Sequence, residues 1–177
     1  MAKVFAITNQ KGGVGKTTTA VNLATGLAAV GKKILLVDFD PQGNATTGLG
    51  VPKNQDNSIY EVLMGLSSLD DTIVASEIPG LHLLPGSTDL AGAEVELVNL
   101  ENREYFLSNA LKELDSSYDY VIIDNPPSLG LLTLNSMIVS HEVLIPLQCE
   151  YYALEGITQL METVERVRES LNPELCI

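Results

Sequence analysis

The sequence has few of the residues that would cross-link it or anchor it in a membrane. Only two cysteines, Cys149 and Cys176, occur in 177 residues, and two cysteines form neither a disulfide framework nor the spacing of a zinc site. We interpret them as reduced thiols of a cytoplasmic protein. The apolar runs are too short to span a bilayer, and the N-terminal MAKVFAIT lacks the pattern of a secretory leader. We therefore expect no stable membrane association.

Basic residues are also scarce. Ten lysines and arginines stand against 23 aspartates and glutamates, so the net charge is -13. A chain this acidic does not attract nucleic acid through its overall electrostatic field. Its close basic pairs, Lys32–Lys33 and Arg166–Arg168, are interpreted as exposed ends of strands and helices. Any DNA binding would need a local basic patch or residues outside this chain.

What the sequence does have is a globular composition. Its apolar residues alternate between the pattern of buried strands and the spacing of helices. Apolar residues make up 45% and charged residues 19%, as in ordinary globular proteins. Continuous apolar runs predict buried strands over residues 3–8, 33–37, 81–84, 119–123 and 143–147. Apolar residues at helical spacing predict helices over residues 17–30, 102–114 and 154–171. This alternation predicts an α/β fold in three layers, with a mostly parallel sheet and helices on both faces.

We expect residues 1–177 to form a single domain. The polar, glycine-rich stretch 40–57 is predicted to be a long functional loop. The final residues, PELCI, resemble the start of another strand. The domain is therefore expected to lack its C-terminal elements.

Residues 9–19 read NQKGGVGKTTT, between a predicted strand and a predicted helix. Three glycines in this stretch allow a tight turn and close approach of a ligand to the backbone. The N–H groups of the loop and of the helix start form an anion-binding nest, which predicts a phosphate-binding loop. Lys16 is placed to reach the β- and γ-phosphates, the Thr17 hydroxyl to bind Mg²⁺, and Thr18 to donate to an inner phosphate. The predicted binding residues are Lys11, Gly12, Gly13, Val14, Gly15, Lys16, Thr17 and Thr18.

Two acidic sites follow the predicted strands. Asp124 ends the run DYVIID, where a phosphate-loop enzyme holds its Mg²⁺ directly or through water. Asp40 follows the run KILLV and could orient or activate an attacking water. We expect Thr17, Asp40 and Asp124 to form the metal site. Asp38 is either a second-shell partner of the magnesium or a turn residue.

Four stretches carry a resemblance to a known family. They are KGGVGKTTT, VDFDPQGNATTGLG, YDYVIIDNPPSLGLLTLN and VLIPLQCEYYALEG, and together they resemble the ParA/Soj partition ATPases over essentially the whole chain. The loop has the deviant form of this group, in which Gln10 replaces the first glycine of the usual pattern and Lys11 adds a second lysine.

The resemblance implies an ATPase that uses ATP and Mg²⁺ and forms a homodimer around two nucleotides. Lys11 would reach the phosphates of the partner subunit, and Asp40 would be the catalytic carboxylate, so Lys11, Lys16 and Asp40 are the expected catalytic residues. The implied partners are non-specific DNA, contacted mostly by residues outside this chain, and a ParB-type centromere-binding protein that stimulates hydrolysis. The ATP-bound form would then associate with the nucleoid.

One position departs from the family pattern, and three alternatives stay open. Asn125 stands where the family more often has cysteine or another small residue, and we expect a minor effect. A MinD-like membrane-cycling ATPase would need a C-terminal amphipathic helix, which is not visible in this sequence. A non-enzymatic nucleotide-binding scaffold would keep its turnover unchanged after Asp40→Ala. A metabolic phosphate-loop kinase would leave Lys11 and the stretch DPQGN unexplained.

Overall fold

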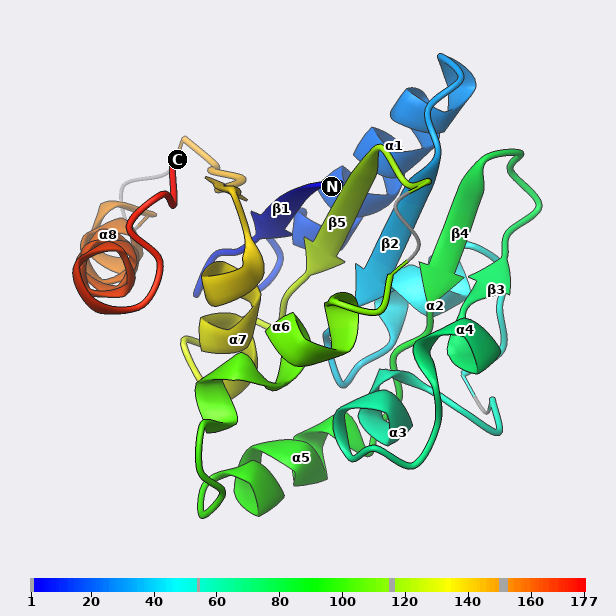
Figure 1. Ribbon diagram of the computed structural model, residues 1–177. Helices are drawn as coiled ribbons and strands as arrows, with labels where there is room; N and C mark the ends of the chain where they lie inside the picture. Colours follow the sequence, from blue (N-terminus) through cyan, green and yellow to red (C-terminus); the bar gives the residue numbers. More distant parts are fainter. Residues whose placement is uncertain (1, 54, 115–116, 150–152) are drawn as a thin grey trace.

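The computed structural model describes residues 2–53, 55–114, 117–149 and 153–177, and within them one sheet of six strands forms the centre (Figure 1). The strands are β1 (Lys3–Ile7), β2 (Ile34–Asp38), β3 (Val74–Ala75), β4 (Leu81–Leu84), β5 (Tyr120–Asp124) and β6 (Glu142–Leu144). Their spatial order is β3-β4-β2-β5-β1-β6. All neighbouring strands are parallel except β3, which runs antiparallel to β4. The predicted α/β class with a mostly parallel sheet is confirmed.

The three central strands end at the same level. Ile7 and Asp38 both pair with Asp124 in the register of the sheet. The segments after β1, β2 and β5 therefore meet above one edge of the sheet, which is where ligands bind in open α/β folds.

Helices α1 (Lys16–Ala29) and α2 (Asn44–Gly48) cover one face of the sheet. The buried side of α1 is built on Ala20, Ala24 and Ala28. These small side chains let the helix approach the strands closely, where they pack with Ile7, Leu36 and other buried aliphatic residues. Gly31, at φ 83°, ends α1 as predicted.

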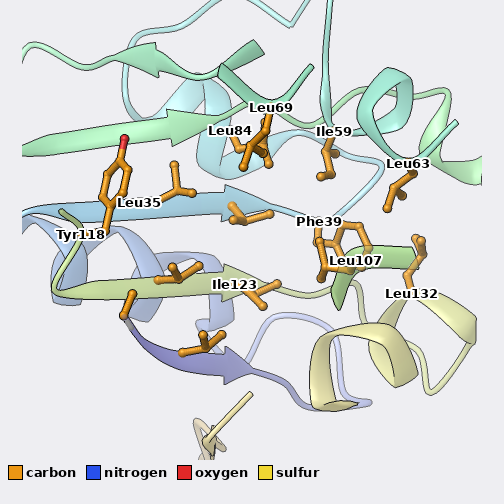
Figure 2. Close-up of a cluster of buried hydrophobic side chains, with 14 of the residues drawn as sticks. Leu35, Phe39, Ile59, Leu63, Leu69, Leu84, Leu107, Tyr118, Ile123 and Leu132 are labelled. Atoms are coloured by element: carbon orange, nitrogen blue, oxygen red, sulfur yellow. The ribbon is translucent and has the colours of Figure 1, made fainter. Parts of the chain in front are cut away.

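A larger group of helices covers the opposite face. It consists of α3 (Ile59–Leu63), α4 (Leu69–Thr72), α5 (Leu90–Leu97), the 3₁₀ helix Arg103–Tyr105, α6 (Phe106–Leu111) and α7 (Leu131–Val139). Figure 2 shows their buried side chains against the strands. The cluster includes Leu35, Phe39, Ile59, Leu63, Leu69, Leu84, Leu107, Tyr118, Ile123 and Leu132. Helices on both faces complete the predicted three layers.

Helix α8 (Ala153–Ser170) packs beside α7, at the β6 end of the sheet (Figure 1). Leu160, Val164 and Val167 are buried in this contact, so the apolar stripe of this helix is a core face, as expected. Cys176 forms a parallel bridge with Glu142 of β6, so the PELCI segment pairs with the sheet. No helix in the described parts of the chain is long and apolar enough to cross a bilayer.

Some predicted boundaries were wrong. The long loop predicted over 40–57 contains α2, which begins at Asn44. The helix predicted over 102–114 is a 3₁₀ turn followed by α6, and β6 ends at Leu144, before Pro146. Helices α3 and α4 and strand β3 were missed because each has at most five residues and shows no full period. Helices α5 and α7, with eight and nine residues, were also missed.

Candidate functional site

The loop between β1 and α1 has the backbone of an anion-binding turn. Gly13 and Gly15 have φ values of 74° and 89°, a conformation that favours glycine strongly over residues with a side chain. A Cβ atom added at Gly12, Gly13 or Gly15 would meet no heavy atom within 4 Å other than those of its chain neighbours. The concave side of the loop is therefore open to a ligand, and the N–H groups at the start of α1 lie beside it.

The loop is held by residues that the sequence analysis did not select. Asn9 Oδ1 accepts a hydrogen bond from the Lys11 N–H at 3.0 Å, and Asn9 Nδ2 donates to the Pro146 carbonyl at 2.8 Å. Gln148 Nε2 donates to the Gly13 carbonyl at 3.2 Å. The segment after β6 therefore supports the loop from the side, and only the tertiary structure shows this contact.

Lys16 is buried at the start of α1, with 7% of its surface exposed. Its Nζ donates to the Lys11 carbonyl at 3.4 Å. Burial lowers the pKa of Lys16, whereas the charges of Asp124 and Asp40 act in the opposite direction. A buried ammonium with nearby carboxylates is suited to receive the negative charge of a phosphate.

Asp124 is fully buried at the end of β5. Within the described parts of the chain, neither of its carboxylate oxygens accepts a hydrogen bond of regular geometry. The pKa of Asp124 is raised to about 7, mainly by burial and also by the charges of Asp38 and Asp40, whereas the nearby Thr17 hydroxyl and the charge of Lys16 act to lower it. Such a carboxylate would be stabilised by a bound cation, and the Thr17 hydroxyl is close enough to share it.

Asp40 and Asp38 lie at the end of β2. Asp40 is 7% exposed, and its Oδ1 accepts a hydrogen bond from the Gln42 N–H at 2.9 Å. Asp38 is fully buried and accepts hydrogen bonds from Thr46. Asp38 and Asp40 are therefore near enough to Asp124 for their charges to affect it, and the charges of Asp40 and Asp124 also reach Lys16 at this edge of the sheet.

A cavity of about 360 Å³ lies over the loop. Its lining residues are Gly12, Gly13, Gly15, Lys16, Thr17, Thr18, Asp40, Gln42, Asn44 and Pro127. Seven of these are residues that the sequence predicts for the site, whereas Gln42, Asn44 and Pro127 were missed. Val14 is buried, Lys11 is half-buried, and Asp124 is buried next to Thr17, which lines the cavity. The structure thus brings seven of the predicted residues together around one space, while Lys11, Val14 and Asp124 do not line it.

The donors around the cavity fit a magnesium–phosphate group better than a metal held by protein alone. In the part of the chain that the structure describes, no three His, Cys, Asp or Glu side chains converge as a metal-binding group. Mg²⁺ commonly keeps several waters and uses one or two protein oxygens together with substrate phosphates. The Thr17 hydroxyl and the poorly paired carboxylate of Asp124 match that chemistry.

Comparisons with known proteins show the family of the chain. A family described as an AAA domain matches residues 2–177. The chain is 54% identical over 176 residues to the chromosome partitioning protein ParA of Caulobacter vibrioides, covering 98% of this chain and 66% of the relative. It is 53% identical over 178 residues to the sporulation initiation inhibitor protein Soj of Bacillus subtilis, covering 100% of this chain and 70% of the relative. The chain thus spans about two thirds of the length of these relatives.

A solved structure has nearly the same fold. It is the crystal structure of cobyrinic acid a,c-diamide synthase from Mycobacterium smegmatis with a bound ATP analogue and magnesium. The TM-score is 0.95 and the identity is 45%, and the match covers 99% of this chain and 72% of that chain. The likeness therefore extends over every layer of the fold, including the loop that surrounds the cavity.

Proposed function

The chain belongs to the ParA/Soj family of chromosome-partitioning ATPases, and from this premise we propose that it binds ATP with Mg²⁺ and hydrolyses it to control its own assembly. The observation that carries the proposal is the buried Lys16 beside an open phosphate loop, with Asp124 and Asp40 as neighbours. We also propose that residues 1–177 act as one domain of the phosphate-loop type.

In this proposal the loop residues hold the phosphates. The N–H groups of residues 12–18 give the start of α1 a partial positive charge beside the cavity, and Lys16 supplies a full positive charge. Thr17 and Asp124 hold the metal, with Asp40 as a further oxygen donor directly or through water. Bound Mg²⁺ would neutralise phosphate charge and complete the coordination of Asp124.

Asp40 is proposed as the residue that orients the attacking water. It lines the cavity, and its Oδ1 is tied to the Gln42 N–H, which leaves its second oxygen to contact a water. A carboxylate at this position would accept the proton of that water or align it with the terminal phosphate.

Lys11 is proposed to act across a dimer interface. It is half-buried beside the phosphate loop. Two nucleotides enclosed face to face would bring many negative charges into a space with little water, and a lysine from each subunit would offset them. Closure would then depend on the terminal phosphate, because its loss removes the contacts that join the subunits.

The last part of the proposal concerns the partners of the protein. We propose that the ATP-bound dimer binds DNA without sequence preference and associates with the nucleoid, and that a ParB-type protein stimulates hydrolysis. The support is the family, whose named relatives include chromosome partitioning proteins. With a net charge of -13, this chain would need a locally basic surface in the assembled protein to contact DNA.

The decisive experiment is the molar mass of the Asp40→Ala variant in solution, measured by light scattering with ADP and then with ATP and magnesium. This variant is expected to bind ATP and to hydrolyse it about 100-fold more slowly than the wild type, so the dimer accumulates. A mass that doubles only with ATP supports the proposal. Asp40→Ala combined with Lys11→Ala is the matched control, and it is expected to stay monomeric. A molar mass that is the same with ADP as with ATP and magnesium would contradict the assembly cycle.

A further inference from the structure

Asp38 is buried behind the candidate site and is held by one residue of α2. It has no exposed surface. Its Oδ2 accepts two hydrogen bonds from Thr46, one from the backbone N–H at 2.7 Å and one from the hydroxyl at 2.6 Å. Hydrogen bonds to a buried carboxylate are among the strongest in proteins. Asp38 therefore fixes α2 against the end of β2.

The same threonine links Asp38 to a third segment. Thr46 Oγ1 accepts a hydrogen bond from the Gly86 N–H at 3.0 Å, in the segment that follows β4. A Cβ atom added at Gly86 would lie 2.8 Å from the Asp38 carbonyl oxygen, so the backbone approaches here as only glycine allows. We call this three-residue contact the Asp38–Thr46–Gly86 junction.

The junction encloses the turn that carries Asp40. At one end of the turn, the Asp40 N–H lies 3.4 Å from Asp38 Oδ1. At the other end, Thr46 is fixed to Asp38 Oδ2. Between them, Asp40 accepts hydrogen bonds from the Gln42 N–H through Oδ1 at 2.9 Å and from the Gly43 N–H through its carbonyl at 2.9 Å. The turn therefore has little freedom to reorient while both ends are held.

Burying this carboxylate is unfavourable in itself. Burial raises the pKa of Asp38, and the hydrogen bonds from Thr46 offset only part of that effect. A pair of apolar side chains of similar volume would fill the space at lower cost. The junction is thus better explained by the geometry that it imposes on residues 40–46 than by its contribution to stability.

We propose that Asp38 and Thr46 are positioning residues that hold Asp40 in the orientation required for hydrolysis, an inference that rests on the proposed ATPase function. Neither residue lines the cavity. They act through the turn, because Asp40, Gln42 and Asn44 all line the cavity and all lie between the two fixed points.

The test compares Thr46→Val with Thr46→Ser. Valine keeps the volume and removes the hydroxyl, whereas serine keeps the hydroxyl that joins Asp38 to Gly86. In Thr46→Val we expect kcat for ATP to fall at least about tenfold while KM stays within about threefold of the wild type. Thr46→Ser is expected to stay within about threefold in both constants.

Hydrogen exchange gives a readout that needs no nucleotide. The Gly86 N–H donates to Thr46 and the Gln42 N–H donates to Asp40, so the first reports on the junction and the second on the orientation of Asp40. In Thr46→Val both amides are expected to exchange faster, whereas in Thr46→Ser neither changes. Faster exchange at Gly86 alone, with kcat unchanged, would overturn the proposal.

The two proposals fail in different ways. A wild-type protein that hydrolyses no ATP would overturn the ATPase function, and the exchange of the Gln42 amide would still decide whether the junction orders Asp40. If Thr46→Val does not fold, Asp38→Asn replaces it in the same measurements. Asparagine keeps the shape of the aspartate side chain and weakens the acceptor of both hydrogen bonds from Thr46.

Discussion

One aspartate directly precedes strand β5 and another ends it, and the two have opposite pKa shifts. Asp119 precedes the strand at its amino end, where a hydrogen bond from the Lys33 N–H, more than the nearby charge of Lys32, lowers its pKa. Asp124 ends the strand, where burial raises its pKa to about 7. The same residue type is thus stabilised as an anion before the amino end of β5 and destabilised as an anion at its carboxyl end.

The wider surroundings show the same contrast. At the amino edge, Lys32 Nζ lies 3.6 Å from Asp119 Oδ1, and both side chains are more than a third exposed. Lys3 and Glu142 form a second exposed pair. At the carboxyl edge, Asp38, Asp40, Asp124 and Lys16 are all buried. Charges in water need no ligand, whereas buried and incompletely paired charges are typical of functional sites.

The largest effect should come from removing the buried lysine. Lys16→Ala would leave Asp124 and Asp40 without their nearby cation and the phosphates without their charge partner. We expect ATP affinity to fall by at least about 30-fold, because truncating one partner of a buried charge pair costs about 2–5 kcal/mol. Titration calorimetry with ATP and Mg²⁺ measures this. Lys3→Ala, at the exposed edge, is the control. Equal losses in both variants would remove the functional distinction between the edges.

A smaller effect should come from the raised pKa of Asp124. The pKa of Asp124 is higher in the folded chain than in the unfolded chain, so the folded chain favours the protonated carboxyl. The contribution of this group to the free energy of unfolding is therefore fully present below about pH 4 and is lost as the pH rises through 7. Without nucleotide, the wild type should therefore lose about 2 kcal/mol relative to Asp124→Asn between pH 5 and pH 8. Urea unfolding of both proteins at several pH values measures this difference. Parallel pH profiles would show that Asp124 ionises normally.

The smallest effect should come from the exposed pair. In Lys32→Ala the melting temperature is expected to stay within about 1 °C of the wild type, because surface ion pairs contribute little and are screened by salt. ATP affinity should not change, since Lys32 lies at the edge of the sheet opposite the cavity. Differential scanning calorimetry at low and high salt checks the first expectation. A salt-sensitive loss of several degrees would show that the amino edge also depends on its charges.

Sequence patterns predicted the long elements better than the short ones. Helix α1 and strands β2 and β5 follow their periods closely, because each buries a regular stripe or a continuous run. Helices α2, α3 and α4 have only four or five residues. A helix of one turn or slightly more shows no full period, and its existence depends on contacts with the rest of the fold.

The sequence by itself determined the local geometry of the loop. The order of glycines, lysine and threonines in residues 12–18 predicts a backbone suited to binding anions, because those properties are local to the loop. It also placed Asp40 and Asp124 after buried strands, where parallel strands bring their ends together.

The tertiary structure alone decided which of these residues are buried, paired or supported. The support of the loop by Asn9 and Gln148 and the link from Asp38 through Thr46 to Gly86 join segments that are distant in the chain. No local pattern encodes them, because each is a hydrogen bond that exists only once the sheet has brought its partners within reach. Burial of the carboxylates, and with it the raised pKa of Asp124, arises from the same packing.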